Sequence, residues 1–144
     1  MTAVASGSKP TARAPELADR LVRWLETGTR QDGMFAADVF ADLSLPHWRI
    51  QTRGDDAAYR LRADEHPFPG RLRVEALDET DRGFLIQFEE RWRSEGQDWY
   101  CRELIHCLVA DGRISELVVY CTGDWDEAVQ QRHAVQVRLL RPRE

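Results

Sequence analysis

Four segments of alternating apolar and polar residues follow one another in the second half of the chain. Residues 71–77, 83–93, 98–110 and 113–121 show this alternation, which is typical of half-buried strands. The turns between them, at residues 81–83, 94–97 and 110–112, are short and each contains a glycine, so tight turns join the strands and neighbouring strands run antiparallel. The pattern predicts an antiparallel meander and excludes a doubly wound parallel sheet.

Helical patterns dominate the first half. A helix is predicted from Pro15 to Gly28, with an apolar stripe formed by Leu17, Leu21, Trp24 and Leu25. Further predictions are a short helix near residues 32–37, a strand over 39–45, a helix with an aspartate cap over 55–64 and a last helix over 127–135. This order indicates an α+β fold, in which about three N-terminal helices cover one face of a curved, mostly antiparallel sheet.

The chain has 144 residues, which suits a single domain. We place this domain at residues 15–136, between a disordered lead (1–14) and a basic tail (137–144). The net charge of −5 argues against a nucleic-acid partner. The sequence contains no apolar run long enough for a membrane span or a signal peptide, so we expect a cytoplasmic protein with no membrane partner.

The three cysteines constrain the chemistry. Cys101, Cys107 and Cys121 cannot all pair, and their spacing matches no zinc motif. A glycine-rich phosphate loop is also missing from the sequence, so we expect no metal and no cofactor. Cys101 and Cys121 are predicted to be cross-strand neighbours that act as small buried hydrophobic residues.

Three segments resemble the SnoaL-like branch of the nuclear transport factor 2-like superfamily. They are Phe35-Ala36-Ala37-Asp38-Val39-Phe40, Arg53-Gly54-Asp55-Asp56-Ala57 and Val109-Ala110-Asp111-Gly112-Arg113-Ile114-Ser115-Glu116-Leu117. The resemblance covers about residues 16–128 and implies a cone-shaped fold. The superfamily includes polyketide cyclases, ketosteroid isomerase, scytalone dehydratase and limonene epoxide hydrolase, but also non-catalytic domains, so the pocket residues must decide the function.

The resemblance also identifies two acids that this chain lacks. The epoxide hydrolase branch has an acid on the last strand, at the position of Val119, and ketosteroid isomerase has one on the preceding strand, at the position of Ile105. Any catalysis here would therefore need a different set of residues.

The turn around Asp111 decides which side chains face the pocket. A two-residue Asp111-Gly112 turn would pair Val109 with Ile114, whereas a three-residue turn from Ala110 would pair Val109 with Arg113. We favour the three-residue turn, because it gives one largely apolar face and one largely polar face. The apolar face then holds Cys101, Glu103, Ile105 and Cys107 with Ser115, Leu117, Val119 and Cys121, extended by Phe84, Ile86, Phe88, Glu90 and Trp92.

Glu90 and Glu103 would then point into an apolar cavity, where burial raises the pKa of a carboxyl group. Such a group acts as a general acid or base near neutral pH. The alternative is that one or both lie at the rim or pair with a buried arginine such as Arg60. His47 is a third catalytic candidate, as a proton shuttle after the first strand, whereas we interpret His66 as a helix-end residue. The predicted ligand-binding residues are Trp24, Trp48, Tyr59, Phe88, Trp92, Trp99, Cys101, Leu117, Val119 and Cys121.

Two functions follow from these residues. The first is a cofactor-free acid/base enzyme of the cyclase, isomerase or dehydratase type, acting on an apolar carbonyl-bearing molecule in natural-product biosynthesis. The alternative is a non-catalytic ligand-binding or dimerisation module. A homodimer through the outer sheet face is expected, because Leu104, Leu108, Ile114, Val118 and Tyr120 would otherwise form an exposed apolar strip.

Overall fold

The computed structural model describes residues 10–141, and side chains from residue 14. Its elements are α1 (Pro10–Thr27), β1 (Phe35–Leu45), β2 (Trp48–Arg53), α2 (Asp55–Glu65), β3 (Gly70–Thr80), β4 (Gly83–Ser94), β5 (Gln97–Ala110), β6 (Arg113–Cys121) and α3 (Glu127–Gln136). The six strands form one sheet in the order β2-β1-β6-β5-β4-β3, in which the β1–β6 pair is parallel and every other pair antiparallel. The predicted α+β architecture and the four-stranded meander are confirmed.

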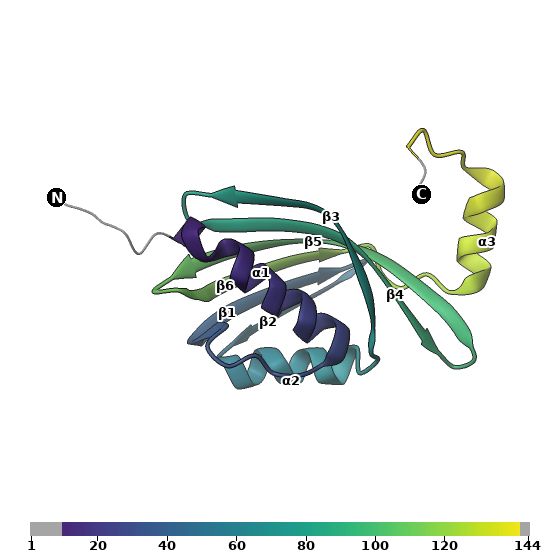
Figure 1. Cartoon of the computed structure of the whole chain (residues 1–144). Helices are drawn as coiled ribbons and strands as arrows, with labels where there is room; N and C mark the ends of the chain where they lie inside the picture. The colour runs from purple at the N-terminus through teal and green to yellow at the C-terminus, as the bar shows by residue number, and fades with distance from the viewer. Residues whose placement is uncertain (1–9, 142–144) are drawn as a thin grey trace.

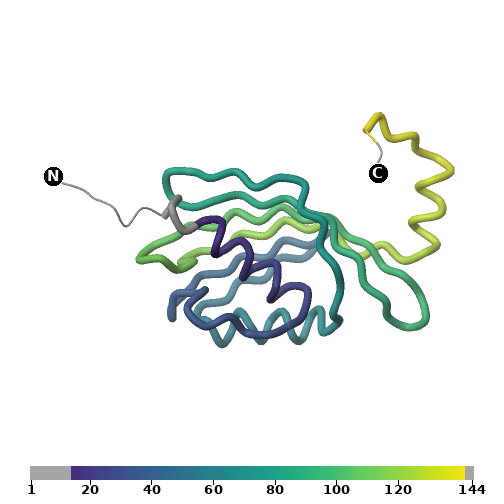
Figure 2. The backbone as a smooth tube through the Cα atoms, viewed as in Figure 1, coloured from purple at the N-terminus to yellow at the C-terminus, as the bar shows by residue number. Residues whose placement is uncertain are grey.

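The sheet bends around two helices, α1 and α2, which lie on its concave inner face (Figure 1). α1 packs on β3 and β4, and α2 packs on β1 and β2. The tip of the long β4–β5 hairpin and the third helix, α3, extend away from the part of the sheet that α1 and α2 cover (Figure 2). None of the helices between residues 10 and 141 has the length and apolar content needed to cross a membrane.

α1 buries the predicted stripe. Leu17, Leu21, Trp24 and Leu25 are all at most 5% exposed. The helix ends as predicted at Gly28, whose φ of 77° is left-handed and whose N–H donates to the carbonyl of Trp24 at 2.7 Å. However, α1 begins at Pro10 instead of Pro15, so residues 10–14 belong to a helix. The rest of the predicted lead, residues 1–9, lies outside the described residues, as do residues 142–144 of the predicted tail.

The predicted helix near residues 32–37 is wrong. Residues 32–34 form a turn and Phe35 already begins β1, so α1 is the single helix before the sheet instead of about three. Met34 and Phe35 are buried as expected for apolar residues, but β6, some eighty residues away in sequence, supplies their backbone partner: Ile114 N–H donates to Met34 O at 2.7 Å. The predicted aspartate cap of α2 is also wrong, because Gly54 occupies the N-cap and no side chain caps the helix.

The β5–β6 hairpin contains the two-residue turn, so our favoured three-residue turn is wrong. Asp111 and Gly112 have φ values of 54° and 75°, and Ala110 pairs with Arg113 and Val109 with Ile114. The next pair is Leu108 with Glu116, so Ser115 is an extra residue in a β-bulge. The bulge shifts the register by one residue, so that Cys107 pairs with Leu117 and Ile105 with Val119.

From Leu117 onwards, the residues of β6 therefore lie on the faces that we predicted for them. Phe84, Ile86, Phe88, Glu90 and Trp92 of β4 are buried on the inner face, as are the alternate residues of β5. Ile114 is completely buried in the core, so it does not belong to the exposed strip expected on the outer face. Ser115, expected on the inner face, is instead the extra residue of the bulge, and its hydroxyl donates to the carbonyl of Leu108.

Candidate functional site

A cavity of about 190 Å³ lies between the inner face of the sheet and the two helices. Its walls are mostly apolar, with contributions from α1, α2, β1, β5 and β6. Its polar lining residues include Cys101, Glu103 and Cys121 on the sheet and Arg62 and His66 on or next to α2. An apolar enclosure with a few converging polar groups is the usual form of a small-molecule site.

Glu103 is one of four acids that line the cavity, together with Asp42, Glu65 and Asp124. It lies on β5 opposite Cys121 of β6 and is 8% exposed. Within residues 14–141 no cationic side chain pairs with its carboxylate, and its recorded partner is the thiol of Cys101, which donates to Oε2 at 3.3 Å. Burial raises the pKa of Glu103 well above its ordinary value of 4.5, and the charge of nearby Glu90 raises it further.

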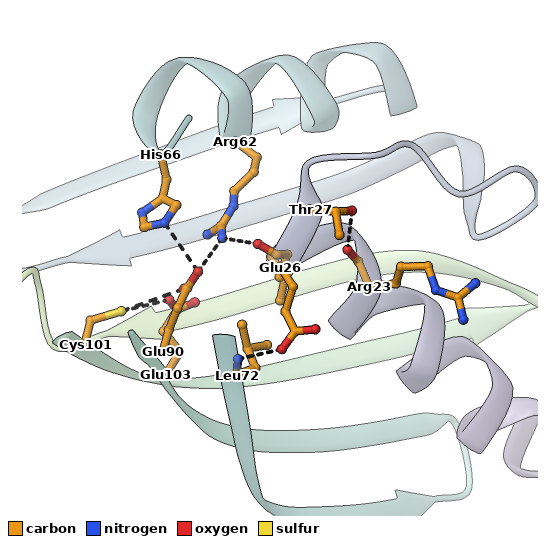
Figure 3. Close-up of polar contacts among 10 residues, drawn as sticks. Arg23, Glu26, Thr27, Arg62, His66, Leu72, Glu90, Cys101 and Glu103 are labelled. Carbon is orange, nitrogen blue, oxygen red and sulfur yellow. Dashed lines mark hydrogen bonds and ion pairs between the residues drawn. The ribbon is translucent and has the colours of Figure 1, made fainter. Parts of the chain in front are cut away.

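Glu90 lies deeper in the protein, and an ion pair with Arg62 compensates its negative charge. It is completely buried, yet Arg62 Nη2 donates to its Oε2 at 2.6 Å and His66 Nε2 lies 3.3 Å from the same oxygen (Figure 3). Burial alone would raise the pKa of Glu90, but the contacts with His66 and Arg62 outweigh it and hold the pKa below its ordinary value. The surroundings of the two glutamates therefore shift their pKa values in opposite directions, upward for Glu103 and downward for Glu90.

Both partners of Glu90 come from α2 and its C-cap. Arg62 also donates to the carbonyl of Leu25 at 2.8 Å, so it joins α2 to the end of α1. His66 follows α2, and its ring packs edge-on against Trp92 and Phe68 with centroids 4.4 and 5.5 Å apart. Its side chain is only 10% exposed, so it is a buried site residue as well as the helix-end residue that we predicted.

The sequence analysis did not identify Arg62 or His66 as site residues. It considered Arg60 as the buried cation, but Arg60 is exposed and the partner is Arg62, two residues further along the same helix. The available signal was their spacing: residues four apart lie on one face of a helix. Because this stretch also contains Arg60, the spacing alone does not show which arginine turns inward.

The predicted ligand-binding residues divide into two groups. The cavity is lined by Trp24, Cys101, Leu117, Val119 and Cys121. The others lie elsewhere: Phe88 is in the closed core, Tyr59 packs against Trp24 and Phe35, and Trp92 stacks on Trp99 at 6.3 Å. His47 and Trp48 are exposed, with His47 in the β1–β2 turn at a φ of 64° and Trp48 68% exposed, and neither lines the cavity.

The outer face carries a separate, open hollow of about 660 Å³ between the sheet and α3. Its charged side chains are largely engaged with each other. Arg102 donates to both carboxylate oxygens of Glu75, and Glu89 accepts from Arg73 and Tyr100. This face thus has the polar character that we predicted for it, without an acid in apolar surroundings.

Comparison with known proteins is informative at the level of structure. No family model matches the sequence, and no curated protein matches it significantly. Among solved structures, a nuclear transport factor 2-like protein from Anabaena variabilis superposes with a TM-score of 0.68 at 13% identity, over 80% of this chain and 90% of that one.

Two further structures extend this likeness. A protein from Jannaschia sp. assigned as a SnoaL-like polyketide cyclase gives a TM-score of 0.63 at 14% identity, over 89% of this chain and 94% of that one. An LEH-like epoxide hydrolase from M. tuberculosis gives a TM-score of 0.60 at 11% identity, over 80% of this chain and 85% of that one. At such low identity these likenesses show the fold alone: the chain has the nuclear transport factor 2-like fold.

Proposed function

We propose that the chain is an acid/base enzyme that isomerises, dehydrates or cyclises a small, largely apolar carbonyl compound. The observation that carries the proposal is geometric: the carboxyl group of Glu103 faces an apolar cavity without a cationic partner among the described residues. In such surroundings a carboxyl group stays neutral and donates a proton or a hydrogen bond to a carbonyl oxygen. The fold hosts both enzymes and non-catalytic domains, so the proposal depends on this site and not on the fold.

We assign roles to Glu103, Glu90 and His66. Glu103 is the general acid that protonates the substrate oxygen, and solvent water takes the proton that leaves the α-carbon. Glu90, ionised beside Arg62, keeps a fixed negative charge behind the site and holds the imidazole of His66 at the cavity wall. We do not assign His47 a role in catalysis, because it lies in an exposed turn outside the cavity.

The size of the cavity narrows the substrate class. A volume of about 190 Å³ is below the 300–1,000 Å³ or so that is common for ligand pockets. We therefore propose a compact substrate, smaller than a steroid or a folded polyketide chain, in a natural-product pathway of the cytoplasm.

A non-catalytic binding module is the second candidate. The observation that favours it is that Ile105 and Val119, the positions of the acids of the related enzymes, are both apolar wall residues here. Such a module would bind the same compounds without changing them.

Proton exchange distinguishes the two candidates. Small cyclic ketones, such as cyclohexanone, are incubated with the protein in D₂O, and loss of the α-proton signal is followed by NMR. Binding is followed separately by tryptophan fluorescence, to which Trp24 in the cavity wall contributes. We expect catalysed exchange in the wild type and a loss of about a hundredfold or more in Glu103→Gln, since general acid catalysis contributes about 10²–10⁴.

The matched control is Glu116→Gln on the outer face of β6, which should exchange like the wild type. Ketone binding that quenches tryptophan fluorescence, combined with exchange that is the same in the wild type and in Glu103→Gln, would identify a binding module and refute the enzyme.

A further inference from the structure

Two thiols and a carboxylate meet on the cavity side of β5 and β6. Cys101 and Glu103 are two residues apart on β5 and so share a face, and Cys121 of β6 lies opposite Glu103. The two sulfur atoms and one carboxylate oxygen all lie within 4.8 Å of one another. All three residues line the cavity, so a small ion has access to them.

Their spacing suits a metal ion. In a tetrahedral zinc site, with Zn–S near 2.3 Å and Zn–O near 2.0 Å, neighbouring ligand atoms are roughly 3.5–3.8 Å apart. Cys101 Sγ lies 3.3 Å from Glu103 Oε2, close to this separation, and the limit of 4.8 Å leaves only small side-chain rotations to be made. We propose that Cys101, Glu103 and Cys121 bind one thiophilic divalent cation, of which zinc is the best fit.

The donor set selects the class of metal. Two thiolates favour zinc and similar borderline-soft ions over magnesium and calcium, which prefer oxygen ligands throughout. Three protein ligands leave a fourth position, which faces the cavity and can take a water molecule or a ligand atom; this is the arrangement of catalytic zinc sites.

Glu90 supports this site from behind without completing it. Its Oε1 lies 3.9 Å from Cys101 Sγ, while its Oε2 is held by Arg62 at 2.6 Å. Groups in this outer position orient metal ligands and commonly change the affinity 10–100-fold.

The metal site goes beyond the proposed function and does not depend on it, because a chain without enzymatic activity would still bind the ion. The two uses of Glu103 exclude each other: a carboxylate that coordinates a cation has no proton to donate. Bound metal would therefore switch the cavity from proton donation to a Lewis-acid site.

Cobalt is the probe, because Co²⁺ takes tetrahedral zinc sites and its thiolate complexes absorb in the near ultraviolet. The full chain, kept reduced with a phosphine, is titrated with CoCl₂ and then with ZnCl₂. We expect one Co²⁺ per chain with a thiolate charge-transfer band, which Zn²⁺ removes. Cys121→Ser should halve the band and weaken binding at least about tenfold, and Cys101→Ser should do the same.

Two further variants make the test decisive. Cys107→Ala is the matched control, because Cys107 is a buried cysteine of the same strand outside the cavity lining; it should keep the full band. Glu103→Gln should weaken binding while keeping the contribution of both thiolates. Near-ultraviolet circular dichroism checks the fold of each variant, and the half-buried Cys121 is the safest position to change. The proposal is overturned if the wild type gives no thiolate band, or if Cys107→Ala loses as much as Cys121→Ser.

Discussion

Replacing Arg62 with methionine removes the cation that neutralises the buried carboxylate of Glu90. Glu90 is fully buried, and the ion pair measures 2.6 Å. Breaking one side of a buried pair commonly costs about 3–5 kcal/mol, because the remaining charge is left uncompensated. At roughly 3–4 °C per kcal/mol for a chain of this size, we expect the melting temperature to fall by about 10 °C or more.

The pH dependence of the free energy of unfolding identifies the cause of this destabilisation. In the wild type the pKa of Glu90 is lowered, so its contribution to stability is present above its unfolded value of 4.5 and is lost as the pH falls through the folded value. Without Arg62, His66 is the remaining partner of the carboxyl group, which must either keep a poorly compensated buried charge or bind a proton. The folded state then gains protons, and the destabilisation by Arg62→Met should be larger at pH 8 than at pH 5.

Urea unfolding at both pH values measures these effects. Arg60→Met is the matched control: this exposed arginine lies on the same helix, and its replacement should cost less than about 0.5 kcal/mol. Adding Glu90→Gln to Arg62→Met should recover much of the loss, because the uncompensated charge is gone. A cost for Arg62→Met that is equal at pH 5 and pH 8, with no recovery in the double variant, would refute the electrostatic explanation.

Three further predictions concern the rest of the sheet. Gly83→Ala should destabilise the fold by about 1–3 kcal/mol in urea unfolding, since a Cβ there would overlap the carbonyl oxygen of Cys107. Tyr100→Phe should leave the ultraviolet titration below about pH 11 unchanged, because burial and Glu89 raise the pKa of Tyr100. Tyr120→Glu should convert the proposed homodimer to a monomer in sedimentation equilibrium, since Tyr120 and its cross-strand partner Leu104 are 59% and 39% exposed; a monomeric wild type would contradict the dimer.

Alternation in the sequence predicted the strands of the meander, because a period of two reports burial directly. The inward positions of Glu90 and Glu103 followed from the same pattern. β2 was not predicted, since Trp48–Arg53 is a short strand at the sheet edge with mostly exposed side chains. The helix expected near residues 32–37 failed for another reason: pairing with β6 is non-local, and no local pattern reports it.

The partners of the site residues were the least predictable part. Arg62 and His66 reach Glu90 from α2 and its C-cap, and α2 ends 25 residues before Glu90 in the chain, so only the packing of α2 on the sheet reveals the contact. The approach of Cys101 and Cys121 was anticipated. We did not predict that these two thiols meet the carboxylate of Glu103, because linear spacing detects only metal motifs whose ligands are close in sequence.

The bulge at Ser115 coincides with an irregularity in the next strand. Between the pairs Phe35–Ile114 and Phe40–Glu116, β1 advances five residues while β6 advances two. Two adjacent strands are thus dislocated at one level of the sheet, and such dislocations increase bending and twist. The depth of the concave face then depends in part on residues that do not line the cavity themselves. Variation in length around Ser115 and Ala36 would reshape the pocket, so related chains could acquire new ligands without changing a single wall residue.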